Sequence, residues 1–186
     1  RDFCLSRGLG DVYKRQYKYF TQFGLKGKTG IDLPGEEKGQ DWGREYITSL
    51  EGYLSLATAS FGQRFTVTPL QMITAFSAVI NGGNLYQPYV VQSITDASGA
   101  VLQNTEPTLT RQVVSQESSD RARAILESVV SEGTGGNAYQ AGYRIGGKTG
   151  TADKTGTKTN DNPKGDVVVS FMCFAPADDP LSLIHI

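Results

Sequence analysis

The most regular helical pattern of the chain covers residues 69–80, whose apolar side chains recur at helical spacing. Thr68 precedes this segment and is a favourable N-cap, and Pro69 takes the first helical position, where its missing N–H loses no hydrogen bond. The glycine-containing sequence 81–83 follows at once. We therefore predict a helix over 69–80.

Three further segments have helical character. Apolar residues of 117–130 share one side of a helix, and the glycine-rich run 133–136 should end it. Residues 17–23 resemble the last turns of a helix that stops at Gly24. The small, apolar segment 53–60 predicts either a short buried helix or a packed loop.

Strand patterns dominate the last third of the chain. Residues 143–150 form a candidate strand, 151–164 are polar and turn-like, and 167–174 are almost continuously apolar, which is typical of a central strand. Earlier, 89–95 and 100–102 flank a turn and predict a β-hairpin. Helices and strands in this mixture indicate an α/β (α+β) layered fold.

Composition excludes several classes of protein. The chain has 186 residues, is 38% apolar, and has a formal net charge of −1. Nucleic-acid-binding domains that depend on bulk charge are usually strongly basic, so we expect no nucleic-acid partner. No apolar run is long enough for a membrane helix. Two cysteines and one histidine are too few for a disulfide framework or a Cys/His zinc site, and we expect no metal or cofactor.

Both ends of the chain look foreign to the rest. Residues 11–16, DVYKRQ, can be encoded by GAT GTG TAT AAG AGA CAG, whose reverse complement encodes LSLIHI, the sequence of residues 181–186. One short DNA element in opposite orientations, such as a sequencing adapter, would produce both ends. We therefore predict that 1–16 and 181–186 are adapter flanks and that 17–180 form part of one domain. The only histidine then lies in a flank, so a histidine general base is not expected.

Residues 142–149, GYRIGGKT, match the phosphate-binding P-loop pattern letter for letter. That pattern requires a strand before its first glycine and a helix starting near its lysine. The sequence predicts neither, so a P-loop nucleotide binder is a remote alternative.

A strand through residues 148–151 explains the same residues better. Alternation would place Lys148 and Gly150 on one face and Thr149 and Thr151 on the other. Gly150 leaves room for a ligand backbone, the lysine offers a point charge for a carboxylate, and the threonines offer hydroxyl groups. An exposed strand N–H can bind an oxyanion. Together these groups would form a cradle for a peptide carboxy-terminus.

The chain also resembles a known family on four blocks in order. The run GGKTGTA at 146–152 is similar to the Lys-Thr-Gly box of penicillin-binding proteins, the active-site serine D,D-transpeptidases. Agreement extends to GLKGKTGIDLPGE (24–36), to TASFGQRFTVTPLQMITAFSAVINGG (58–83), and to 129–152 with the strand that follows. Order and spacing resemble the monofunctional class B enzymes over essentially all of 17–180.

The resemblance implies a serine β-lactamase/D,D-peptidase-like fold, with a mainly antiparallel sheet flanked by helices and incomplete in this chain. It implies that Lys148 stabilises the substrate carboxylate and the proton network, that the Thr149 and Thr151 hydroxyls hydrogen-bond the carboxylate, and that the Thr151 N–H completes the oxyanion hole. Gly150 belongs to the same catalytic box. The substrates would be D-Ala-D-Ala stem peptides of peptidoglycan, with β-lactams as substrate mimics.

Two boxes of that family are missing. The sequence contains no Ser-x-x-Lys and no Ser-x-Asn, so we expect the nucleophile to lie outside this chain and the chain alone to be inactive. The parent protein would act in cell division or cell shape at the outer face of the bacterial membrane, with an anchor missing here and a membrane glycosyltransferase as a partner. The alternative within the fold is a β-lactam sensor or β-lactamase-like protein.

A second Lys-Thr-Gly occurs at Lys28, Thr29 and Gly30. It lies before the predicted 69–80 helix, whereas the family's catalytic box follows that helix. We therefore expect residues 28–30 to form a structural turn and assign the catalytic role to Lys148.

Overall fold

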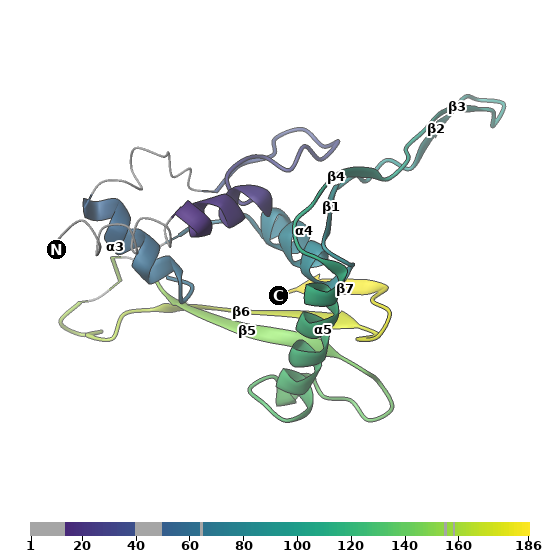
Figure 1. The fold of residues 1–186 in the computed structure, drawn as a ribbon. Helices are drawn as coiled ribbons and strands as arrows, with labels where there is room; N and C mark the ends of the chain where they lie inside the picture. Colours follow the sequence, from purple (N-terminus) through teal and green to yellow (C-terminus); the bar gives the residue numbers. More distant parts are fainter. Residues whose placement is uncertain (1–13, 40–49, 64, 155, 158) are drawn as a thin grey trace. The chain divides into compact units, whose positions relative to one another are not determined.

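A computed structural model describes residues 14–39, 50–63, 65–154, 156–157 and 159–186. The chain forms two compact units: unit 1 contains Arg1–Asp41 and Thr66–Gln116, and unit 2 contains Trp42–Phe65 and Glu117–Ile186. Residues 1–13, most of the predicted N-terminal flank, lie outside the described part. Figure 1 shows the elements of both units.

Unit 1 is built around helix α4, Pro69–Ile80, with the predicted bounds. The Thr68 hydroxyl accepts a hydrogen bond from the Gln71 N–H at 3.1 Å, and the Gln71 side chain accepts one from the Thr68 N–H at 2.8 Å. This reciprocal capping box fixes the start of the helix. Helical backbone also covers 14–22 and ends before Gly24, which has φ +75°. The prediction of a helix end at Gly24 is confirmed.

The strands of unit 1 form one long hairpin arm. Strand β1 (Asn84–Gln87) pairs with β4 (Thr108–Gln112), and β2 (Ser93–Thr95) pairs with β3 (Val101–Asn104), all antiparallel. The predicted hairpin is confirmed, with its turn at 96–99, but its first strand begins at Ser93, so 89–92 were wrongly predicted as strand. In Figure 1 the arm extends away from α4, and every residue of β2 and β3 is exposed. The apolar core of the unit lies at the base of the arm, where α4 contributes Ala78, β1 contributes Leu85, and Val113 follows β4.

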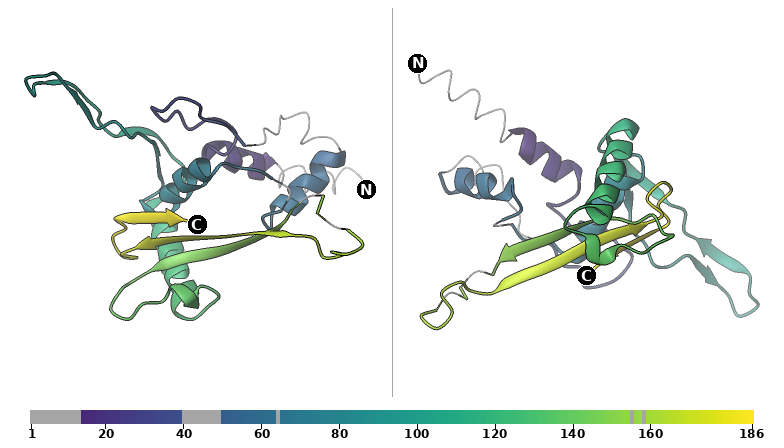
Figure 2. Two further views of the ribbon diagram at one scale, coloured as in Figure 1. Left: turned by 180° about the vertical axis from the view of Figure 1, so that it is seen from behind. Right: turned by 90° about the horizontal axis from the view of Figure 1, so that it is seen from below.

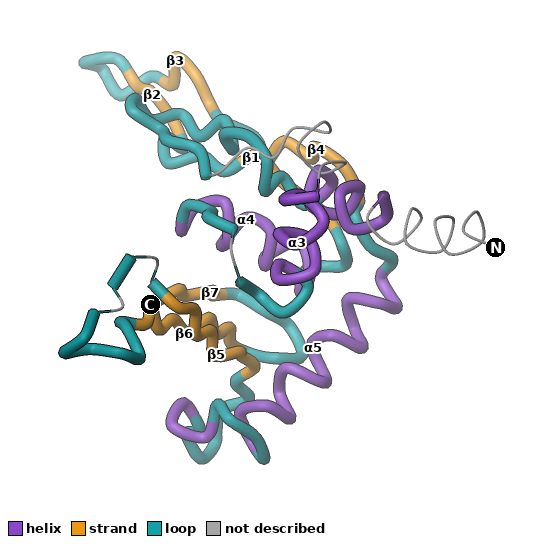
Figure 3. The backbone as a smooth tube through the Cα atoms, turned by 90° about the vertical axis from the view of Figure 1, so that its left-hand side faces the viewer, coloured by secondary structure: helices purple, strands orange, loops and turns teal. Residues whose placement is uncertain are grey.

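Unit 2 contains a three-stranded antiparallel sheet in the order β5–β6–β7. The strands are β5 (Gly146–Asp153), β6 (Val167–Ala175) and β7 (Ser182–His185). Figure 2 shows β5 and β6 as a long twisted ribbon with β7 beside one end of β6, and Figure 3 shows the three strands next to one another. Helix α3 (Leu50–Ala59), helix α5 (Gln116–Ser131) and the short 3-10 helix η1 (Gly136–Ala138) complete the described elements. Of the two alternatives for 53–60 the helix is correct, although Leu54 is 57% exposed and the helix is not buried throughout; the 117–130 helix is confirmed.

The predicted 143–150 strand is displaced by three residues. The segment before Gly146 is a turn around Gly142, whose φ is +87°. Strand pairing then continues to Asp153, opposite Val167, although 151–153 look polar in the sequence. An antiparallel strand tolerates polar side chains where they face solvent, and Thr151 and Asp153 are both exposed. The prediction that 151–164 form a turn is thus wrong for its first three residues.

Strand β6 is central, as predicted, although one half of it is uncovered. Val167, Val168 and Val169 are each more than half exposed, whereas Met172 and Phe174 are buried. Residues 181–186, the second predicted flank, pair with 171–175 and include β7. Strand pairing uses backbone groups that any extended segment carries, so the adapter origin of 181–186 stays a prediction.

Candidate functional site

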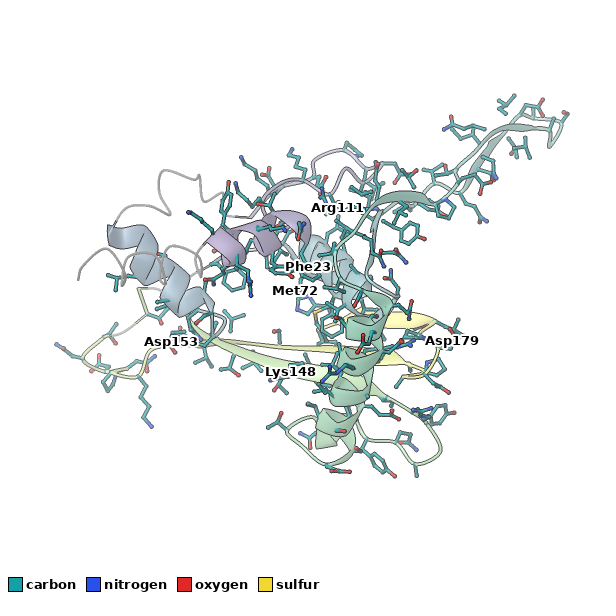
Figure 4. All side chains as sticks on the ribbon, in the orientation of Figure 1. Phe23, Met72, Arg111, Lys148, Asp153 and Asp179 are labelled. Atoms are coloured by element: carbon teal, nitrogen blue, oxygen red, sulfur yellow. The ribbon has the colours of Figure 1, made fainter. Side chains whose placement is uncertain are left out.

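The four candidate residues Lys148, Thr149, Gly150 and Thr151 lie together in β5, paired with residues 169–172 of β6. The prediction that they share one strand is confirmed. Because β5 is the first strand in the order β5–β6–β7, one side of its backbone has no strand partner within the described residues. Figure 4 shows Lys148 in the middle part of β5 and Asp153 at its far end.

The open side of β5 presents the backbone groups of alternate residues. The Lys154 N–H donates to the Asp166 carbonyl oxygen, so the even-numbered residues of this stretch direct their backbone N–H and C=O groups toward β6. Thr149, Thr151 and Asp153 consequently turn their N–H and C=O groups to the open edge. The Thr151 N–H has no hydrogen-bond partner among the described residues. An extended ligand could therefore pair here by β-augmentation.

The Lys148 ammonium lies at this same edge. Its Nζ donates to the Thr149 carbonyl oxygen at 2.8 Å and contacts Thr149 Oγ1 at 3.3 Å. Although alternation separates the two side chains, the long lysine side chain wraps around the strand edge. No carboxylate forms an ion pair with Lys148 in the part of the chain that the structure describes. A positive charge, a hydroxyl and an open N–H thus line one strand edge, which suits a carboxylate next to a polarised carbonyl.

The structure shows a second reason for glycine at position 150, which the sequence did not reveal. A Cβ on Gly150 would lie 2.7 Å from Oγ of Ser170, its partner on β6. The glycine therefore leaves room for a neighbouring side chain, in addition to the ligand access that the sequence predicted.

Gln63, which follows α3, belongs to the site although no local sequence feature predicted it. Its Nε2 donates to the Thr151 carbonyl oxygen at 3.0 Å, and its Oε1 accepts the Asp153 N–H at 3.3 Å. One carboxamide thus occupies the open edge of β5 directly beyond the Thr151 N–H. The only sequence signal was its place in the block 58–83, since 88 residues separate it from Thr151.

Arg144 was missed as well. Its guanidinium forms a two-pronged pair with Glu127 of α5, at 2.8 Å and 2.7 Å, and an ion pair with Asp178 at 3.0 Å. The hydrogen bond from Arg144 holds the pKa of the Glu127 carboxyl below its usual value, although partial burial opposes this. The Arg144 carbonyl also accepts the Ala177 N–H. Arg144 thereby ties α5 to the turns that flank β5 and β6.

The second Lys-Thr-Gly has the expected structural role. Glu36 accepts hydrogen bonds from Thr29 N (2.6 Å), Thr29 Oγ1 (2.7 Å) and Gly30 N (3.1 Å). Gly30 has φ +78°, which a strand does not allow. Residues 28–30 thus lie in a structural loop that the Glu36 carboxylate closes, rather than in a defined turn.

The nucleotide-binding alternative is not supported. The P-loop-like segment 142–149 leads into β5, whereas phosphate binding of that type requires a helix after the lysine. Cys173 is half-buried in β6, and burial raises the pKa of its thiol, which disfavours a reactive thiolate. The described residues contain no group of three or more potential metal ligands. None of their helices is long and apolar enough to cross a membrane.

Comparison with known proteins gives a consistent result. Residues 9–185 match the family model for the penicillin-binding protein transpeptidase domain. The chain is 43% identical over 174 residues to stage V sporulation protein D of Bacillus subtilis, covering 93% of this chain and 26% of that protein. It is 31% identical to penicillin-binding protein PbpB of Mycolicibacterium smegmatis, covering 93% and 27%. The chain thus spans about a quarter of the length of these relatives.

Solved structures agree at the level of the fold. Penicillin-binding protein 3 of Mycobacterium tuberculosis, complexed with ampicillin, superposes with a TM-score of 0.77 at 28% identity, covering 92% of this chain and 38% of that one. The D,D-transpeptidase domain of a peptidoglycan glycosyltransferase from Eggerthella lenta gives a TM-score of 0.76 at 27% identity, covering 93% and 42%.

Proposed function

The chain belongs to the penicillin-binding protein transpeptidase family, and we propose that it supplies the carboxylate-binding side of the active site of a peptidoglycan D,D-transpeptidase. The observation that carries this proposal is the open edge of β5, the side of the strand away from β6, where the Lys148 ammonium and the Thr151 N–H lie and where no described residue forms a further strand. The sensor and nucleotide-binder alternatives have no comparable support.

In the proposed reaction each residue of β5 has a separate role. A peptide ending in D-Ala-D-Ala would lie antiparallel to β5, with its carboxylate near Lys148 and the Thr149 and Thr151 hydroxyls. Its scissile carbonyl would accept the Thr151 N–H, which stabilises negative charge on that oxygen as the carbonyl is attacked. Gly150 would let the ligand approach closely. β-Lactams would occupy the same edge as mimics of the peptide.

The attacking serine has to come from outside this chain, because Ser-x-x-Lys and Ser-x-Asn are absent from the sequence. We therefore propose that the parent protein, and not this chain alone, carries out acyl transfer. We also propose that it acts at the outer face of the cytoplasmic membrane together with a membrane glycosyltransferase. The reason is that a transpeptidase needs glycan strands as its substrate, and a glycosyltransferase makes them.

Acylation of the full-length protein by a fluorescent penicillin tests the role of Lys148. Lys148→Met should lower the second-order rate constant of labelling by about 100-fold, the size expected when one charged group that stabilises the transition state is lost. Lys28→Met is the matched control, because it changes the same tripeptide in the loop that Glu36 closes. We expect its rate constant to stay within about twofold of the wild type.

Equal losses in the two variants would contradict the assignment, as would full activity of Lys148→Met. Covalent labelling of the 186-residue chain by itself would show that a nucleophile is present in it and would overturn the proposed division of roles.

A further inference from the structure

The Gln63 carboxamide occupies the open edge of β5 in the manner of a ligand peptide group. It donates to the Thr151 carbonyl and accepts from the Asp153 N–H, and these are the two bonds that a paired peptide backbone would make there. No other described side chain bonds to this stretch of the edge apart from Lys148, which contacts Thr149.

Antiparallel pairing fixes where a ligand would meet Gln63. A ligand residue opposite Thr151 uses its own C=O for the Thr151 N–H and its own N–H for the Thr151 carbonyl. The ligand residue two positions upstream would lie opposite Asp153, because its carboxylate end is near Lys148. Its carbonyl oxygen would need the Asp153 N–H, which Gln63 already holds.

We propose that Gln63 is a specificity-determining positioning residue that ends the pairing of ligand backbone with β5 at Thr151. The Thr151 carbonyl has two lone pairs, so the ligand N–H can share it with Gln63 Nε2. The Asp153 N–H has one hydrogen, so Gln63 excludes a ligand carbonyl from it. Ligands would then gain no backbone hydrogen bond beyond the residue opposite Thr151. This inference rests on the proposed function of β5.

A purely structural role for Gln63 accounts less well for these contacts. Both hydrogen bonds are exposed, and an exposed neutral hydrogen bond adds little to the stability of the fold. In recognition, by contrast, the same carboxamide decides whether one backbone donor is available. The expected phenotype is therefore a change in ligand preference rather than loss of folding.

Two penicillins that differ by one group test the proposal on the full-length protein. Benzylpenicillin and N-acetylampicillin share their skeleton, but the second has an acetamido group whose carbonyl corresponds to the ligand carbonyl opposite Asp153. The measured quantity is the ratio of their second-order acylation rate constants. For the wild type we expect a ratio near one, since Gln63 keeps the Asp153 N–H occupied.

Three variants make the outcome decisive. In Gln63→Leu the Asp153 N–H is free, and the ratio should rise about fivefold in favour of N-acetylampicillin, which is the effect of one additional hydrogen bond. Gln63→Glu still accepts that N–H and should keep the wild-type ratio. Gln87→Leu removes a glutamine side chain that donates to the Gly30 carbonyl in unit 1, and should also keep it.

An unchanged ratio in Gln63→Leu, with both penicillins still acylating the protein, would overturn the role of Gln63 and leave the proposed function intact. A fivefold rise in Gln63→Glu as well would show that the Asp153 N–H is not the relevant group. Failure of both penicillins to acylate the wild type would instead refute the proposed function, and the inference with it.

Discussion

Gly146 and Phe174 face each other across β5 and β6, and the Phe174 ring fills the space that a side chain at position 146 would need. A Cβ on Gly146 would lie 2.3 Å from Phe174 Cζ. Phe174 is 1% exposed and is among the largest fully buried side chains described. A Cβ added to the next glycine, Gly147, would lie 2.6 Å from the Met172 carbonyl oxygen. The two glycines before Lys148 therefore serve the packing of the sheet.

Gly146→Ala should destabilise the fold by about 1–3 kcal/mol, because the added methyl group would overlap a fully buried ring and force it to move. Urea unfolding followed by circular dichroism measures this loss. The matched control is Gly136→Ala in η1, where no atom lies within 4 Å of the Cβ position.

Combining Gly146→Ala with Phe174→Leu should recover part of the loss, since a smaller side chain opposite makes room for the methyl group. Strictly additive effects of the two substitutions would contradict the proposed clash.

Gln71→Leu should lower the free energy of unfolding of unit 1 by about 2–4 kcal/mol. Gln71 is 1% exposed, and its side chain bonds the Gly39 and Thr68 N–H groups and the Gly27 carbonyl, the last at 2.6 Å. Leucine fills a similar volume but leaves these backbone groups without a partner, which costs about 1–3 kcal/mol for each group that water cannot reach. Thermal unfolding measures the effect.

The exposed Gln92→Leu substitution is the matched control for Gln71, since its side chain lies on the solvent-exposed arm, and we expect a change within about 0.5 kcal/mol. A comparable loss at both positions would show that burial of hydrogen-bonding groups is not the cause.

The contact between Asp32 and the start of the arm should depend on pH. Hydrogen bonds from the Val91 and Val90 N–H groups, both at 2.8 Å, hold the pKa of the Asp32 carboxyl below its ordinary value. A carboxyl whose pKa is depressed on folding stabilises the contact above its unfolded pKa of about 4, and this stabilisation is lost as pH falls through the folded value. Amide hydrogen exchange of Val90 and Val91 should therefore lose protection in acid.

Asp32→Asn should leave the protection of these two amides weaker at neutral pH and independent of pH between about 2 and 6. If the wild-type amides kept their protection throughout the acid range, the carboxylate would not be the group that holds them.

The uncovered half of β6 should make the isolated chain aggregate. Val167 and Val169 share one face of the strand, are 51% and 68% exposed, and lie beyond the residues that pair with β7. Exposed apolar strands associate edge to edge, and charged residues suppress this. The double substitution Val167→Lys and Val169→Lys should raise the soluble fraction severalfold in light-scattering and sedimentation assays. Ile94→Lys with Val101→Lys, on the exposed arm, provides the comparison.

Local signals predicted the elements that depend on neighbouring residues. Helix α4 has its predicted bounds because Thr68, Pro69 and the 81–83 turn determine both ends within a few residues. The edge strand β5 was placed three residues too early, because its polar end resembles a loop until its pairing with Val167 is known.

The contacts that shape the candidate site were harder to predict. Gln63 and Thr151 are far apart in sequence, and a glutamine in a polar loop has no local feature that marks it as a partner of a strand edge. The same holds for Arg144, whose partners Glu127 and Asp178 lie on either side of it at long separations. The blocks that resemble the family indicated where the site lies. Its hydrogen bonds could be identified only from the folded structure.

The two copies of Lys-Thr-Gly give the chain an internal comparison of tolerance to mutation. At Gly30 the positive φ of the backbone favours glycine, so substitutions should damage the loop, Asn and Asp least and β-branched residues most. At Gly150 the backbone is an ordinary strand and the nearest obstacle is the end of the flexible Ser170 side chain. Alanine there should fold and report on ligand access alone. A saturation library read separately for abundance and for penicillin labelling would thus distinguish the glycine needed for folding from the glycine needed for chemistry.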